Sequence, residues 1–134
     1  MIIFLDENFP PQLADALHIL QQQLNKRNNT SFQVKSIKTH FREGIKDEEW
    51  IPLVGQMQGI VITRDHRIQT IKHQKELFIQ HGLGIFFFDI VSGAKYWDIV
   101  KFFISKWEDI LNKIQNNRTP FSYRYTAKSI MKLS

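Results

Sequence analysis

The chain contains no cysteine and no long run of apolar residues. The lack of cysteine excludes disulfide bonds, thiolate zinc sites and a cysteine nucleophile, and it fits a reducing cytoplasm. No stretch approaches the roughly 18 apolar residues of a membrane span. The apolar start, Met1–Leu5, is too short for a secretory signal. We therefore expect a cytoplasmic protein with no membrane partner.

Several catalytic motifs are also missing. The five histidines do not have zinc-ligand spacing. Neither a glycine-rich phosphate loop nor a serine nucleophile elbow occurs. These absences leave the carboxylates as the main candidates for chemistry.

The size and charge of the chain indicate one domain with a basic end. The 134 residues are enough to bury a core, and we predict a single domain over 1–134. Acidic and basic residues balance in 1–112, so the whole net charge of +5 lies in the basic C-terminal segment, 113–134. This charge suits a polyanion such as RNA. A solvated tail, or a segment that docks on a partner, explains it equally well.

Strand-like and helix-like patterns alternate along the chain. Short apolar strands are predicted at 1–5, 32–37, 60–63 and 84–88, and a further short strand at 121–126. Helical patterns fill the intervals between them. This order predicts an α/β sandwich with a mainly parallel sheet and right-handed crossovers.

Each predicted helix has an apolar face. Asn8 is a candidate N-cap for the first helix, and Gly82 is a candidate C-cap for a helix over 66–81. A helix that opens at Asp47 contains Pro52, which favours a later start or a distortion. We read the last helix as one long element whose face serves the core or an interface. The predicted faces are Leu13, Leu17, Leu20 and Leu24; Trp50, Leu53, Val54 and Met57; Ile68, Ile71, Leu77 and Phe78; and Trp97, Val100, Phe103 or Ile104, Trp107, Leu111 and Ile114.

Acidic residues recur at the ends of the predicted strands. Functional sites in open α/β sheets form beyond the carboxyl ends of the strands. Neighbouring strands lie about 4.8 Å apart, so acids that follow adjacent strands can share one ion. Helix capping is the alternative for any single acid, but the recurrence favours a site for Mg²⁺ or Mn²⁺, which prefer oxygen ligands and assist phosphodiester hydrolysis. The acids are Asp6 and Glu7 after the first strand, Asp65 after the third, Asp89 after the fourth, and Asp47, Glu48 and Glu49 at a helix entry.

Three motifs resemble those of a known family. Residues 4–11, Phe-Leu-Asp-Glu-Asn-Phe-Pro-Pro, resemble the opening of the short PIN-like family related to VapC toxins. Residues 46–50 resemble its acidic helix entry, and residues 61–65 its third-strand ending. The resemblance continues through 82–88 and 120–124, and it thus covers nearly the whole chain.

The resemblance implies a fold, an activity and partners. It implies a PIN-like three-layer α/β/α sandwich and an Mg²⁺- or Mn²⁺-dependent endoribonuclease. The protein would act as the toxin of a VapBC-type toxin–antitoxin pair, with RNA as substrate and a cognate antitoxin as partner. The oligomeric state stays open, because the aromatic face of the last helix suits a homodimer or an antitoxin helix as well as the core.

The resemblance also assigns roles to individual residues. Asp6 is the central metal ligand, Asp65 the second, and Asp47 the acid at the helix entry; these three are the catalytic candidates. Glu48 and Asp89 are further candidates for the metal, and Glu7 and Thr63 are supporting residues. The candidates for RNA contact are Arg124, Arg64 and Lys128. Which of Asp47, Glu48 and Glu49 faces the metal stays open.

Two other functions fit parts of the pattern. A non-catalytic PIN-like domain would bind RNA or a protein, and its affinity would survive the loss of Asp6 and Asp65. A phospho-acceptor receiver domain also has acids after its first and third strands. That class needs a lysine at the end of its last sheet strand, where this chain has Phe88 and Asp89, so we rank it third.

Overall fold

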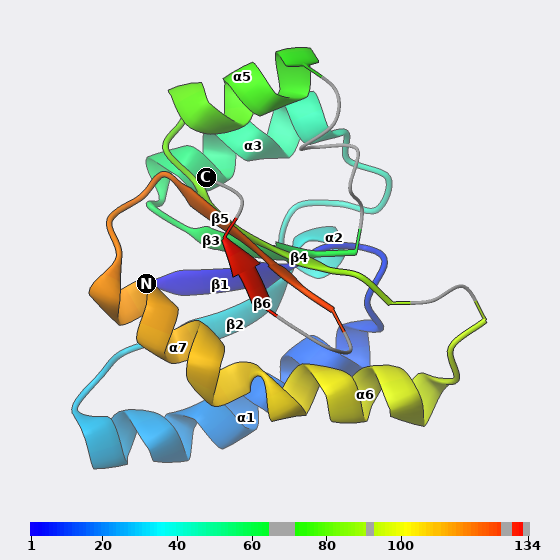
Figure 1. Cartoon of the computed structure of the whole chain (residues 1–134), viewed down its shortest axis with the longest axis vertical. Helices are drawn as coiled ribbons and strands as arrows, with labels where there is room; N and C mark the ends of the chain where they lie inside the picture. The colour runs from blue at the N-terminus through cyan, green and yellow to red at the C-terminus, as the bar shows by residue number, and fades with distance from the viewer. Residues whose placement is uncertain (65–71, 91–92, 127–129, 133–134) are drawn as a thin grey trace.

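A six-stranded sheet forms the centre of the molecule (Figure 1). The computed structural model describes residues 1–64, 72–90, 93–126 and 130–132, with side chains for 1–64, 76–90 and 93–126. The strand order is β2-β1-β3-β4-β5-β6. The first five strands are parallel, and β6 runs antiparallel to β5. The strands are β1 (Ile2–Leu5), β2 (Gln33–Ser36), β3 (Ile60–Thr63), β4 (Gly84–Phe88), β5 (Phe121–Tyr125) and β6 (Ile130–Lys132).

Helices cover both faces of this sheet (Figure 1). One face carries α1 (Pro11–Asn28), α6 (Tyr96–Ser105) and α7 (Trp107–Asn116). The other carries α2 (Ile37–His40), α3 (Asp47–Gln56) and α5 (Lys72–Gln80). Buried side chains form a separate cluster on each face. The predicted three-layer α/β/α fold with a mainly parallel sheet is confirmed.

The sequence of β1 explains why this strand lies inside the sheet. Ile3 and Leu5 belong to the core cluster beneath α1, α6 and α7, whereas Phe4 belongs to the cluster beneath α3 and α5. Alternate side chains of a strand point to opposite faces, so a strand covered on both faces is apolar throughout. The residues of β3 and β4 are buried along their whole length for the same reason.

The first helix differs from its prediction at two positions. Pro10 takes the N-cap position in place of Asn8, and Pro11 begins α1, where a missing N–H costs no hydrogen bond. Leu20 is exposed, and Gln21 takes the buried position. The Gln21 side-chain oxygen accepts a hydrogen bond from Trp107 Nε1 at 2.9 Å. This bond satisfies the buried amide oxygen, which is why a polar residue is tolerated there.

The α3 helix begins at Asp47, with Pro52 inside it. Lys46 occupies the N-cap position. Of the predicted apolar face, Trp50 and Val54 are buried.

The rest of the predicted α3 face is wrong. Leu53 and Met57 are 39% and 40% exposed, and Ile51 is buried instead. The buried face of α3 is therefore rotated about the helix axis toward Ile51 and away from Leu53.

The following helix, α5, is confirmed over Lys72–Gln80. Gly82 follows it with a φ of 70°, as expected of a C-terminal cap. The predicted helical residues 66–71, with Ile68 and Ile71, lie outside the described residues.

The predicted long last helix is two helices, with a break at Lys106. Within the first of these helices Phe103 is buried and Ile104 is exposed. Trp97, predicted to lie on the buried or interface stripe, is 68% exposed.

Two short elements were not predicted. The α2 helix follows β2 directly, and β6 adds an antiparallel strand from within the basic segment 113–134. Among the residues that the structure describes, no helix is long and apolar enough to cross a membrane.

Candidate active site at the carboxyl edge of the sheet

The strand order places two predicted site residues next to each other. β3 is a direct neighbour of β1, with Leu5 in register with Ile62. The Asp6 backbone N–H donates to the Ile62 carbonyl oxygen at 3.1 Å. Asp6 and Thr63 therefore meet at the carboxyl ends of neighbouring strands, the edge where sites form in this class of sheet.

Asp6 is a buried carboxylate held by several donors. Its residue is 7% exposed, and Thr63 is fully buried. The Thr63 hydroxyl donates to Oδ2 of Asp6. The backbone N–H of Asn8 donates to Oδ1 at 3.0 Å, and its side-chain amide reaches Oδ2 at 3.4 Å. These contacts fix the orientation of the carboxylate.

Asn8 was assigned to the wrong partner from the sequence. The prediction made it a helix cap, but the structure uses it to hold Asp6. The spacing of the two residues carried the signal, because an Asp side chain commonly accepts a hydrogen bond from the backbone two residues on.

The acids at the entry of α3 form their own contacts. Asp47 accepts a hydrogen bond from Trp50 Nε1 at 3.0 Å, and Glu49 pairs with Arg42. Glu48 is exposed in the same first turn. Three acids there complement the positive end of the helix dipole, so this cluster also has a structural explanation.

Two predicted residues, Asp65 and Lys128, lie outside the described residues. Arg64 is partly buried directly after β3, and Glu7 is exposed. Within 1–64, 76–90 and 93–126, no three His, Asp or Glu side chains form a group that could hold a metal ion. The described acids therefore do not complete a metal site by themselves.

Asp89 and Arg124 lie together at the ends of β4 and β5. Arg124 Nη2 lies 2.5 Å from Oδ2 of Asp89. The Asp89 backbone N–H donates to the Tyr125 carbonyl oxygen at 2.9 Å. The sequence predicted separate roles for them, Asp89 as a metal ligand and Arg124 as an RNA contact, and it did not predict this ion pair. It joins two neighbouring strands at the same edge as Asp6.

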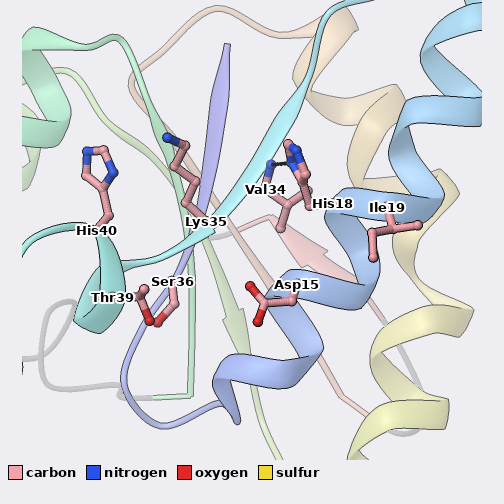
Figure 2. A pocket seen from close by; sticks show the side chains of 8 residues that line it. All are labelled: Asp15, His18, Ile19, Val34, Lys35, Ser36, Thr39 and His40. Carbon is pink, nitrogen blue, oxygen red and sulfur yellow. Dashed lines mark hydrogen bonds between the residues drawn. The ribbon is translucent and has the colours of Figure 1, made fainter.

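A pocket of about 530 Å³ lies apart from these residues, between α1 and the outer strand β2 (Figure 2). Asp15 on α1 faces Ser36 and Thr39 across it. None of the predicted site residues lines this pocket.

The walls of this pocket protect the edge of the sheet. His18 Nδ1 accepts a hydrogen bond from the Val34 N–H at 3.2 Å, which covers an open backbone group of β2. Burial, and then the charge of Lys35, lower the pKa of His40 in the same wall.

Comparison with known proteins identifies the family. A family model described as a PIN like domain matches residues 1–90. The matched region contains β1 and β3 with Asp6 and Thr63 at their ends. Searches of curated proteins and of solved structures each found no match. The family model covers more than half of the chain, and the chain therefore belongs to the PIN-like domain family.

Proposed function

We propose that this protein is a metal-dependent endoribonuclease whose central carboxylate is Asp6. PIN-like domains are often nucleases, so family membership supports a nuclease role. The observation that carries the proposal is the buried Asp6 carboxylate at the carboxyl edge of the sheet, held by Thr63 and Asn8. A carboxylate kept buried and oriented by neighbouring donors suits a metal-ligand role better than a solvated surface role.

The chemistry of the donor set fits Mg²⁺ or Mn²⁺. Such ions take carboxylate oxygens and need no thiolate, and a bound ion supplies positive charge that stabilises the phosphate undergoing cleavage. Asp6 is the first ligand in the proposal. Asp65, which follows Thr63 by two positions in the sequence, is the second. Asp47 and Glu48, with Asp89 as an outer candidate, complete the proposed set.

The role of each supporting residue follows from its contact. Thr63 and Asn8 hold the Asp6 carboxylate in one orientation, so ion binding would not have to order it first. Arg64, Arg124 and Lys128 are the proposed phosphate contacts. Arg124 would serve only if the phosphate competes with Asp89 for the guanidinium.

The finer biological role that we propose is that of a toxin. The support is the likeness of residues 4–11 to the opening of VapC-related PIN-like proteins. In this proposal RNA is the substrate, a cognate antitoxin is the partner, and the enzyme acts in the cytoplasm. Expression of the wild-type chain should arrest growth, and expression of Asp6→Asn should not.

The nuclease activity is tested by cleavage of a mixed pool of structured RNA. Purified protein should cut the pool with Mg²⁺ or Mn²⁺ and not with EDTA. Asp6→Asn should lower the rate by at least about 100-fold, and Thr63→Val by about 10- to 100-fold, because it removes the donor that orients Asp6. Glu108→Gln is the matched control, since it removes an exposed acid of α7, a helix that contributes no candidate ligand.

Two results would contradict the proposal. Equal cleavage by the wild type and by Asp6→Asn would assign the activity to another group or to a contaminant. A folded wild-type protein that binds RNA but does not cut it with either metal would favour the non-catalytic PIN-like domain.

A further inference from the structure

The three tryptophans of the chain are in different environments. Trp50 and Trp107 are 3% and 5% exposed, and their indole N–H groups donate to Asp47 and Gln21. Trp97 is 68% exposed, at the start of α6. Leaving so large an apolar ring in water gives up the free energy that its burial would contribute. One exposed apolar side chain is normal by itself, so the question is whether neighbouring residues extend it into a continuous surface.

Tyr96 extends this exposed aromatic surface. Its ring lies 5.5 Å from the Trp97 ring, centroid to centroid, at an interplanar angle of 84°. Tyr96 is also exposed, and neither ring belongs to a core cluster. The two rings support each other edge to face while the Trp97 ring stays accessible.

Two lysines and one aspartate flank the pair. Lys95 precedes Tyr96, and Lys101 follows Trp97 by four positions; both lysines are exposed. Residues four apart project from the same side of a helix, so Lys101 shares a side with Trp97. Asp98, the acid of the first turn, lies three positions from each lysine and offsets one of the two positive charges, so the net charge of this surface is +1.

The aromatic pair lies at the same edge of the molecule as Asp6. α6 follows the carboxyl end of β4, and β4 is the neighbour of β3, whose Thr63 contacts Asp6. Figure 1 shows the first turn of α6 on the side toward which β1 and β4 run. An extended single-stranded nucleic acid that crosses this edge of the sheet would pass both Asp6 and the aromatic pair.

We propose that Tyr96 and Trp97 form a base-stacking surface for single-stranded RNA. This inference rests on the proposed nuclease function and names how its substrate is held. Aromatic rings stack on bases of any sequence, and adjacent lysines neutralise the phosphates between them. Exposed rings bordered by two lysines match that chemistry, whereas a purely apolar partner surface would leave the lysines unmatched.

Binding is measured apart from cleavage. The Asp6→Asn chain is titrated in EDTA with an oligouridine of about ten nucleotides, within the site sizes of single-strand binders. Trp97→Ala in that background should weaken binding by about 5- to 100-fold. Trp97→Phe should retain most of the affinity, and Trp97→Leu should not, because leucine is apolar but cannot stack. Ile104→Ala, exposed on the same helix, is the matched control and should have no effect.

Two further readouts use the local surroundings of Trp97. Because the other two tryptophans are buried, iodide quenching reports mainly on Trp97, and RNA should protect it. Lys101→Gln should lower the slope of log affinity against log salt by about 0.7, the value for one phosphate contact on a single strand.

The outcomes separate this inference from the nuclease proposal. If Trp97→Ala binds oligouridine as tightly as its parent while cleavage still depends on Asp6, the stacking surface is wrong and the nuclease stands. If Trp97 becomes protected as the RNA-free protein is concentrated, the surface belongs to a second copy of this chain. If the folded protein does not bind oligouridine in EDTA, the stacking surface is wrong; if the wild type also fails to cut the RNA pool with Mg²⁺ or Mn²⁺, both proposals fail.

Discussion

At the residue scale, one buried hydroxyl shows how neighbours change acid–base behaviour. Tyr125 is fully buried, and its hydroxyl donates to Asp109 Oδ2 at 2.6 Å. Burial, and then this hydrogen bond, raise the pKa of Tyr125 far above its usual value. Burial acts to raise the pKa of Asp109, but hydrogen bonds from Lys113 and Tyr125 outweigh it, and that pKa is lowered.

Tyr125→Phe tests this contact. Removing the hydroxyl should lower the free energy of unfolding by about 1–2 kcal/mol. This value is below the usual range for a hydrogen bond to a charged group, because solvent screens the partly exposed Asp109. Tyr125 ionises near pH 10 when unfolded, and its folded pKa is higher. Its stabilisation is therefore complete below about pH 10 and is lost as the pH rises further.

Urea unfolding of both proteins between pH 8 and pH 11 measures this effect. The difference in stability between the wild type and Tyr125→Phe should shrink at the alkaline end. A difference that stays constant with pH would show that ionisation of Tyr125 does not contribute.

At the element scale, α3 and α5 pack closely enough to require a glycine. A Cβ added at Gly55 would lie 2.7 Å from the carbonyl oxygen of His81, just beyond α5. That atom belongs to the backbone, so it cannot move aside like a flexible side chain. Alanine would gain about 1 kcal/mol in helix propensity, but the close contact outweighs this gain.

Gly55→Ala should therefore destabilise the protein by about 1–3 kcal/mol, as an overpacked contact. Gln56→Ala, on the exposed side of the same helix, is the control and should change stability by less than about 0.5 kcal/mol. Thermal unfolding monitored by circular dichroism compares them. A variant Gly55→Ala as stable as the wild type would mean that α3 and α5 are not packed this closely.

At the scale of the whole molecule, the region that matches the family does not contain the complete core. Residues 1–90 supply β1–β4 and the helices α1, α2, α3 and α5. The cluster on the α1 face also needs ten buried side chains from later in the chain. These are Ile99, Val100, Phe103, Trp107, Ile110, Leu111, Ile114, Phe121, Tyr123 and Tyr125.

A chain of residues 1–90 should therefore not fold cooperatively. Loss of those ten side chains would expose to water the apolar side chains that α1, β1, β3 and β4 bury on this face. A whole domain is stable by only about 5–15 kcal/mol, so it does not tolerate an uncovered core face. A sigmoidal unfolding transition of the 1–90 chain in urea would contradict this expectation.

Much of the fold was accessible from the sequence because its signals are local. Continuous apolar runs gave β1, β3 and β4, and the alternation of strands with helical patterns gave the parallel sheet. The predicted position of Asp6 directly after β1 also followed from the sequence. The break at Lys106 and the exposure of Leu20 and Trp97 did not. They depend on which face of each helix meets the sheet, and several faces of these helices are apolar.

The sequence by itself determined the elements, the family resemblance and the acids that follow the strands. Only the tertiary structure decided which of these residues meet. The contact of Asp6 with Thr63 spans 57 positions, and the ion pair of Asp89 with Arg124 spans 35. Local patterns cannot specify such contacts, because they arise from the order of strands in the sheet. That order is set by the packing of both faces at once, and it brought β1 beside β3 and β4 beside β5.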